Sequence, residues 1–105
     1  TGTQELAQFA WATYRTVKYV GQVTDGTDVD AFEVLVTWGG HASNAQDGAA
    51  SIDMTTYAYI SSDTALGNLS TTVDGTNINL IFTNISGDTI SALTYDVIAT
   101  HLAKQ

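Results

Sequence analysis

Apolar side chains recur at every second position along most of the chain. In segment 29–38, Phe32, Val34, Val36 and Trp38 share one side of an extended chain. Successive side chains of a β-strand point to opposite faces, so this period of two predicts a strand with one buried face. The same alternation occurs in segments 14–25, 51–60, 77–85 and 89–102. A first segment, 5–13, fits either a strand or a short helix.

Turn-forming residues separate these segments. The dipeptides Asp25-Gly26 and Asp74-Gly75 are typical of tight turns between strands. A glycine-containing turn follows at 84–89, and longer connections span 39–50 and 61–68. No linker divides the chain. The sequence therefore predicts a single domain, 1–105, with an all-β, jelly-roll-like antiparallel sandwich of about 7–8 strands.

The charge balance and the lack of a long apolar run exclude two classes of partner. The formal net charge is −8 with only three lysines and arginines, so the chain cannot build the basic face that nucleic-acid binding requires. No apolar run is long enough for a membrane-spanning helix, so membrane insertion is not expected. There is no cysteine, which rules out disulfides and thiolate metal sites. We expect no cofactor.

Two of the three cations, Arg15 and Lys18, begin one apolar segment. They lie on opposite faces of a strand, so they do not form one binding patch. Arg15 shares its side with Val17 and Tyr19, which is the expected core side, so its guanidinium needs a carboxylate or carbonyl partner. Lys18 can lay its methylenes along the sheet and keep its ammonium in water. Both are interpreted as structural pins.

Neither histidine nor the acidic turn gives a strong chemical signal. His41 and His101 are not accompanied by a nucleophile elbow at any serine, so we predict no catalytic residues and no enzyme activity.

Asp25, Asp28 and Asp30 are weak candidates for a Ca²⁺ site because clustered carboxylates suit hard cations. The pattern lacks the alternating spacing and the closing glutamate of a calcium-binding loop. A solvated acidic turn without metal is the favoured interpretation.

Three aromatic residues raise an alternative function. Trp38, Tyr57 and Tyr59 could contribute to an apolar platform for a sugar, such as a glycan on a host surface. Aromatic residues in strands more often pack across the sheet. A carbohydrate-binding or receptor-binding adhesion domain therefore stays open as the alternative.

The last two strand segments carry apolar residues on both faces. Leu80 and Phe82 share one face, whereas Ile81 lies on the other and Ile85 follows. In the final segment Val97 occupies one face and Ile98 and Leu102 the other. One core covers only one face of a strand, so we predict a homo-oligomer with Ile81, Ile85, Ile98 and Leu102 at the interface. The alternative is that these residues stay on the surface singly.

The motifs also resemble a known group of proteins. Arg15-x-x-Lys18-Tyr19, the segment 33–37 (EVLVT), Tyr57-x-x-Ile60, Leu66-Gly67 and the segment 75–84 (GTNINLIFTN) follow one another in order. This succession, from Ala12 to Val97, is similar to a β-sandwich module of virion structural and tail-fibre proteins of tailed bacteriophages, especially those that infect cyanobacteria. The loop 39–50 is longer than the family's short turn, and the C-terminal "THLAKQ" replaces its common ending.

The resemblance implies a role in a phage particle. The expected protein is a non-enzymatic fibre, appendage or capsid-decoration module that is located in the virion. Its expected partners are other virion proteins and copies of itself, with a homotrimer as the first choice. Since the family carries no catalytic residues, the resemblance transfers none to this chain.

Overall fold

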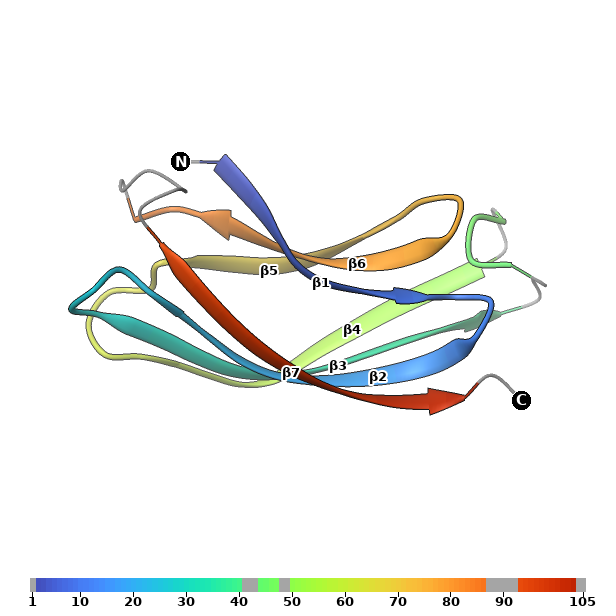
Figure 1. Ribbon diagram of the computed structural model, residues 1–105, viewed down its shortest axis with the longest axis horizontal. Coiled ribbons are helices and arrows are strands. Elements are labelled where there is room, and N and C mark those ends of the chain that lie inside the picture. The colour runs from blue at the N-terminus through green and yellow to red at the C-terminus, as the bar shows by residue number, and fades with distance from the viewer. Residues whose placement is uncertain (1, 41–43, 48–49, 87–92, 104–105) are drawn as a thin grey trace.

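The strands form two antiparallel sheets that pack face to face (Figure 1). The computed structural model describes residues 2–40, 44–47, 50–86 and 93–103. The predicted all-β sandwich is confirmed, and the ambiguous first segment is a strand. The smaller sheet has the order β1-β6-β5 and the larger sheet β4-β3-β2-β7. The strands are β1 (Gly2–Ala10), β2 (Tyr14–Thr24), β3 (Val29–Gly40), β4 (Ala50–Ser61), β5 (Gly67–Val73), β6 (Asn77–Asn84) and β7 (Thr94–Ala103).

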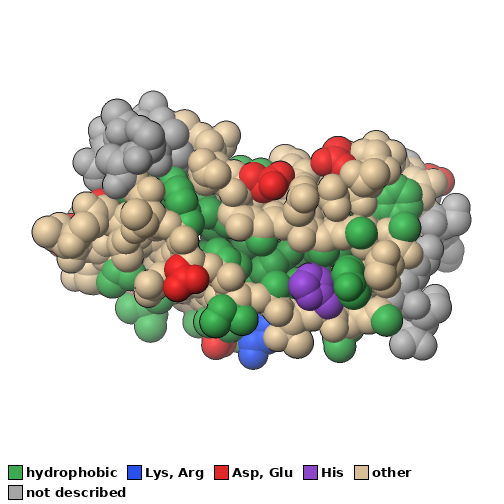
Figure 2. Space-filling model, in the orientation of Figure 1, with side chains coloured by type: hydrophobic (Ala, Val, Ile, Leu, Met, Phe, Trp, Pro, Cys, Tyr) green, Lys and Arg blue, Asp and Glu red, His purple; other side chains and the backbone are tan. Residues whose placement is uncertain are grey.

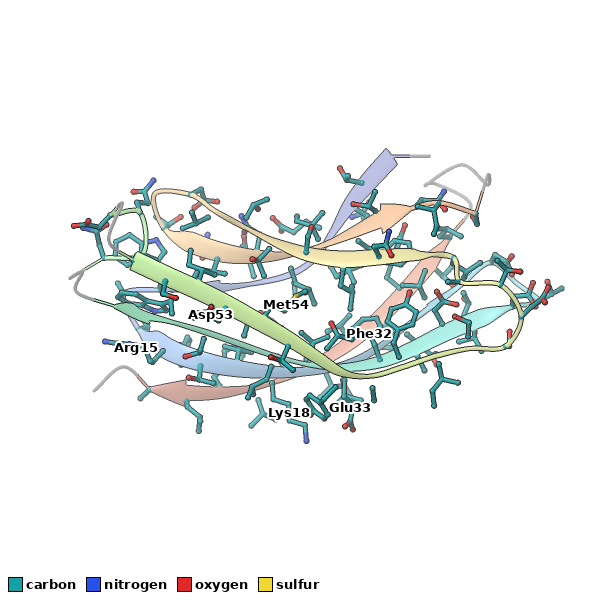
Figure 3. The ribbon with its side chains drawn as sticks, turned by 180° about the vertical axis from the view of Figure 1, so that it is seen from behind. Arg15, Lys18, Phe32, Glu33, Asp53 and Met54 are labelled. Atoms are coloured by element: carbon teal, nitrogen blue, oxygen red, sulfur yellow. The ribbon has the colours of Figure 1, made fainter. Side chains whose placement is uncertain are left out.

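The core lies between the inner faces of the two sheets. Figure 3 shows Phe32 and Met54 pointing into this space, whereas Lys18 and Glu33 point out of the larger sheet. The alternation predicted for β2, β3 and β6 is confirmed, because one side of each strand is buried. The buried apolar residues of these strands are Val17, Tyr19, Val23, Phe32, Val34, Val36, Trp38, Ile78, Leu80 and Phe82.

Two glycines make room for phenylalanine rings. Gly21 lies directly opposite Phe32, and a Cβ atom at Gly21 would stand only 2.7 Å from the Phe32 ring. A Cβ atom at Gly67 would stand 2.4 Å from the ring of Phe82 and 2.2 Å from the backbone oxygen of Thr83. Each sheet thus fills the space above a glycine with a ring, as tight interior packing requires.

Three β-bulges interrupt the regular ladders. The extra residues are Leu6 in β1, Arg15 in β2 and Tyr57 in β4. The bulge in β4 changes which side chains face the core, because one additional residue shifts a strand's alternation by one position. Ile52 and Met54 pack against the core, but after the bulge Tyr59 packs there.

The sequence-based alternation of β4 is therefore wrong beyond the bulge. A strict period of two places Ile60 on the same face as Ile52 and Met54. In the structure Ile60 pairs with Ala31 and is 70% exposed. A bulge leaves no clear mark in a Thr- and Tyr-rich segment, so the shift could not be read from the sequence.

A buried carboxylate connects the two sheets. Asp30 in β3 is fully buried, and its Oδ2 accepts hydrogen bonds from the Tyr59 hydroxyl (2.6 Å) and the Leu66 backbone N–H (2.7 Å). The Tyr59 oxygen also lies 3.0 Å from the carbonyl oxygen of Gly67, at the start of β5. Asp30 and Tyr59 belong to the larger sheet and Gly67 to the smaller one. The carboxylate therefore fixes the chain where it passes from β4 to β5.

Replacing this carboxylate is expected to destabilise the fold. In Asp30→Ala the Leu66 N–H loses its acceptor inside the protein, which costs about 1–3 kcal/mol of unfolding free energy. Tyr59 can turn its hydroxyl proton to Gly67, which limits the loss. Urea denaturation measures the difference. The control Asp63→Ala, an exposed residue in the same connection, should change stability by less than about 0.5 kcal/mol. Equal effects of the two substitutions would contradict a structural role of Asp30.

Candidate functional site

The outer face of the larger sheet carries most of the exposed large apolar side chains. We call Val20, Leu35, Ile60, Ile98 and Leu102 the outer apolar face. They come from all four strands of the sheet. Ile98 is 69% and Leu102 59% exposed, and both belong to β7 at one edge. Several large apolar residues on one sheet face are a signature of an interaction surface.

The strand register shows which of these residues are neighbours. Val20 lies between Glu33 of β3 and Ile98 of β7. In the next row of the same face, Lys18 lies between Leu35 and Thr100. A shallow apolar hollow is lined by Val20, Ala31, Ala58 and Ile60, among others. In Figure 2, green apolar groups occur along the lower margin, where the larger sheet forms the outside of the molecule.

The predicted interface residues do not form one surface. Ile98 and Leu102 lie on the outside of the larger sheet, opposite Val20 and Thr16. Ile81 belongs to β6, the central strand of the smaller sheet, and its neighbours Leu80 and Phe82 point inward. Ile81 therefore faces outward on the opposite side of the sandwich, and Ile85 follows β6 and is exposed. A single flat contact cannot include both pairs.

Part of the outer apolar face could be read from the sequence. Val20 and Leu35 alternate with buried residues of β2 and β3, so their outward direction follows from the period of two. The interface prediction did not include them, because it rested on the last two strand segments alone. Ile60 was missed for a different reason, since the bulge at Tyr57 reverses its expected direction.

Arg15 has a different partner from the one expected. Its guanidinium carbon lies 4.4 Å from the centre of the Trp38 ring, a geometry that gives a cation–π attraction. Among the described residues Arg15 forms no ion pair, and its buried Nε has no hydrogen-bond acceptor. The expected carboxylate or carbonyl partner is therefore replaced by an aromatic face. The position at the core margin is as predicted, because Arg15 stands at the bulge beside the buried Trp38.

Lys18 is exposed on the outer face, as expected from its parity. Its strand neighbours are Leu35 on one side and Thr100 on the other. Within the part of the chain that the structure describes, Lys18 forms no ion pair. Glu33 stands diagonal to it in the next row of the same face, beside Val20 (Figure 3).

The three candidate metal ligands have separate partners. The Oδ1 atom of Asp25 accepts hydrogen bonds from the backbone N–H groups of Thr27 (3.1 Å) and Asp28 (2.7 Å), which closes its turn. These two bonds, the Asp28 one foremost, lower the pKa of Asp25. Asp28 lies near the hydroxyl of Ser62, and Asp30 is directed into the interior. Among the described residues no group of three potential ligands converges on a metal position.

The aromatic residues considered for sugar binding do not form a platform. Trp38 is only 1% exposed. Its ring lies under the guanidinium of Arg15 and packs against Trp11, so it is closed to a ligand. Tyr59 uses its hydroxyl in the Asp30 network and stacks on Phe32. Tyr57, at the bulge, is 49% exposed. The expectation of a sugar contact at Trp38 is therefore wrong, and of the three only Tyr57 offers an open ring.

His101 has no catalytic geometry among the described residues. The exposed His101 ring packs on Tyr14, with 4.5 Å between the ring centres. No hydrogen bond joins His101 to a serine or an aspartate of the described chain. His41 lies outside the described residues.

Comparisons with known proteins found no relative for this chain. No protein-family model matches it, and neither a curated protein nor a solved structure does. The likeness to phage structural modules therefore stays a resemblance of motifs. The residues that the structure describes include no helix long and apolar enough to cross a membrane.

Asp74 makes the second Asp-Gly turn in the same way as Asp25. Its Oδ1 accepts the backbone N–H groups of Thr76 (2.9 Å) and Asn77 (2.8 Å), and the Asn79 amide donates to its Oδ2. These bonds, with the Thr76 bond as the largest contribution, lower the pKa of Asp74 from 3.8 to about 2. The turn therefore holds the ionised form of the carboxylate.

Acid should weaken this turn. The folded-state pKa of Asp74 lies below the unfolded value, so its stabilisation is present above about pH 4 and is lost as the pH falls toward 2. We expect Asp74→Asn to reduce the decrease in melting temperature between pH 4 and pH 2. Asp63→Asn, at a carboxylate with no hydrogen bond among the described residues, should keep the wild-type slope. Parallel curves for wild type and Asp74→Asn would contradict this assignment.

Arg15→Ala is expected to lower the unfolding free energy by about 1–2 kcal/mol, because the Trp38 ring loses both the cation and the packed methylenes. The urea midpoint and the slope of the transition measure this loss. Lys18→Ala is the matched control, since it removes an exposed cation from the same strand, and its effect should stay below about 0.5 kcal/mol. If Arg15→Ala leaves the midpoint unchanged, the contact with Trp38 contributes nothing.

Proposed function

We propose that this protein is a non-enzymatic structural module of a tailed-phage virion, in a fibre, an appendage or a capsid decoration. It acts by assembling with copies of itself and with other virion proteins. The observation that carries the proposal is the exposure of Ile98 and Leu102 on β7, where Ile98 stands opposite Val20 of the outer apolar face. The motif resemblance supports the phage assignment.

The energetics favour a covered outer face. Burying a large aliphatic side chain contributes about 1.5–3 kcal/mol. Ile98 and Leu102 lie on the same face of one strand, so a single contact can bury both. Single apolar residues are common on protein surfaces, but Ile98 stands directly opposite Val20. Association of copies is the direct way to cover such a surface in a protein that works in a repeating particle.

The sugar-binding alternative has weaker support. Only Tyr57 of the three candidate aromatic residues is open to a ligand, and a sugar platform needs polar groups fixed around a concave apolar site. The hollow beside Ile60 is shallow and mainly apolar. We therefore place self-assembly first.

Native mass measurement tests the proposal. Light scattering after size exclusion, at micromolar protein, should give an oligomer, and the resemblance implies a trimer. Ile98→Asp should shift the mass to that of a monomer with an unchanged β-sheet circular dichroism spectrum, because the residue is exposed. Ile81→Asp is the control on the opposite face and should leave the oligomer intact. A wild-type monomer over the whole concentration range would refute self-assembly.

A further inference from the structure

The four edge strands of the sandwich differ in how they are protected against pairing with another chain. Edge strands expose unpaired backbone groups, and proteins protect them with bulges, short lengths, prolines or charges. β1 carries the bulge at Leu6 together with Glu5, and β4 carries the bulge at Tyr57 together with Asp53. β5 is the shortest strand, with 7 residues.

β7 has no bulge, no proline and no short length, and Asp96 is its one carboxylate. It runs for 10 residues, from Thr94 to Ala103, and contains neither lysine nor proline. The irregularity opposite its C-terminal end adds a residue to β2, at Arg15, so β7 itself is regular. It pairs with β2 on one side, and Figure 1 shows no strand beyond it on the other. The side chain nearest the middle of its outer face is Ile98.

We infer that β7 pairs antiparallel with β7 of a second copy, around a two-fold axis at Ile98, so that the two larger sheets become one continuous sheet. This inference rests on the proposed self-assembly and names its contact, and it predicts a dimer rather than the trimer that the motif resemblance implies. Antiparallel partners that stand directly opposite must share a face. An axis at Ile98 meets this condition, and it pairs Thr94 with Leu102 of the partner copy and Ile98 with its own equivalent.

Charge favours this register over the one with its axis at Asp96. An axis at Asp96 would place two carboxylates opposite each other, which is unfavourable. The axis at Ile98 places Asp96 of the partner copy opposite Thr100. In each copy Thr100 is also the neighbour of Lys18 on the same face. Lys18 and the partner copy's Asp96 then lie in one row, two strand spacings or about 10 Å apart, across a small side chain.

A lysine side chain can lie over the intervening threonine and bring its ammonium toward that carboxylate. The two-fold axis forms the contact twice. Within one chain Lys18 and Asp96 cannot meet in this way, because Asp96 stands opposite Gln22, four residues further along β2. Glu33 stands diagonal to Lys18 on the β3 side, and the second copy adds a carboxylate on the β7 side while it covers Ile98.

Charge substitutions give the sharpest test, read as the dissociation constant from sedimentation equilibrium. Asp96→Lys replaces a negative by a positive charge and changes the net charge from −8 to −6. General repulsion between copies therefore decreases, yet the variant should dissociate about tenfold more readily, because each Lys18 then faces a like charge. Asp53→Lys makes the same change in net charge on β4 and should associate as well as the wild type or better. Adding Lys18→Glu to Asp96→Lys should restore the wild-type constant.

Cross-linking tests the position of the axis. The chain has no cysteine, so an introduced thiol has no competitor. Residues directly opposite in an antiparallel pair have Cα atoms about 4.5–5.5 Å apart, which allows a disulfide. Ile98→Cys should oxidise to a covalent dimer. Ile60→Cys is the control, equally exposed at 70% but on the far edge strand, and should stay monomeric in denaturing gels.

The outcomes separate this inference from the proposed function. Three results together would support the edge pairing. The dissociation constant rises about tenfold in Asp96→Lys alone, Lys18→Glu restores it, and Ile98→Cys forms a covalent dimer. Association of Asp96→Lys equal to or tighter than that of Asp53→Lys would overturn it. A wild-type trimer without cross-linking at position 98 would also overturn it, while leaving self-assembly standing. A wild-type monomer would refute both.

Discussion

The apolar contact between the two sheets is the interaction on which the rest of the structure depends. Every strand of the larger sheet turns alternate side chains toward the smaller sheet, and Trp38, Tyr19 and Phe82 are among the largest groups that become fully buried. Because this contact uses one face of each strand, the other face is left with whatever the sequence places there. The buried Asp30 carboxylate adds direction to a contact that is otherwise non-directional.

The same constraint explains where the outer apolar face lies. In β2 and β3 the residues that alternate with the core include Lys18, Val20 and Leu35, so the outer face inherits a mixture of apolar and charged groups. The bulges then determine which edges are irregular. They leave β7 straight, at the edge where Ile98 and Leu102 already extend the outer apolar face. The core and the outer apolar face are therefore two results of one alternation.

The fold class and the core of β2, β3 and β6 could be predicted from the sequence, because their period of two is uninterrupted. The direction of Ile60 could not, since the extra residue at Tyr57 depends on how β4 meets β3. The placement of Ile81 and Ile98 in different sheets could not be predicted either, because the alternation along a strand does not show to which sheet the strand belongs. The predicted carboxylate or carbonyl partner of Arg15 was wrong for a similar reason. A charged group at a core margin predicts a carboxylate, yet the aromatic face of Trp38 was closer in space, supplied by a neighbouring strand.

The two glycine–phenylalanine contacts couple positions that a reader of the sequence would treat as independent. At Gly21 the Phe32 ring occupies the volume where a side chain would stand, and at Gly67 the Phe82 ring does the same. An alanine at either glycine needs a smaller residue in place of its ring, and a smaller residue at either ring leaves a void unless the glycine gains a side chain. Neutral sequence drift at these four positions is therefore restricted to paired exchanges, one pair in each sheet.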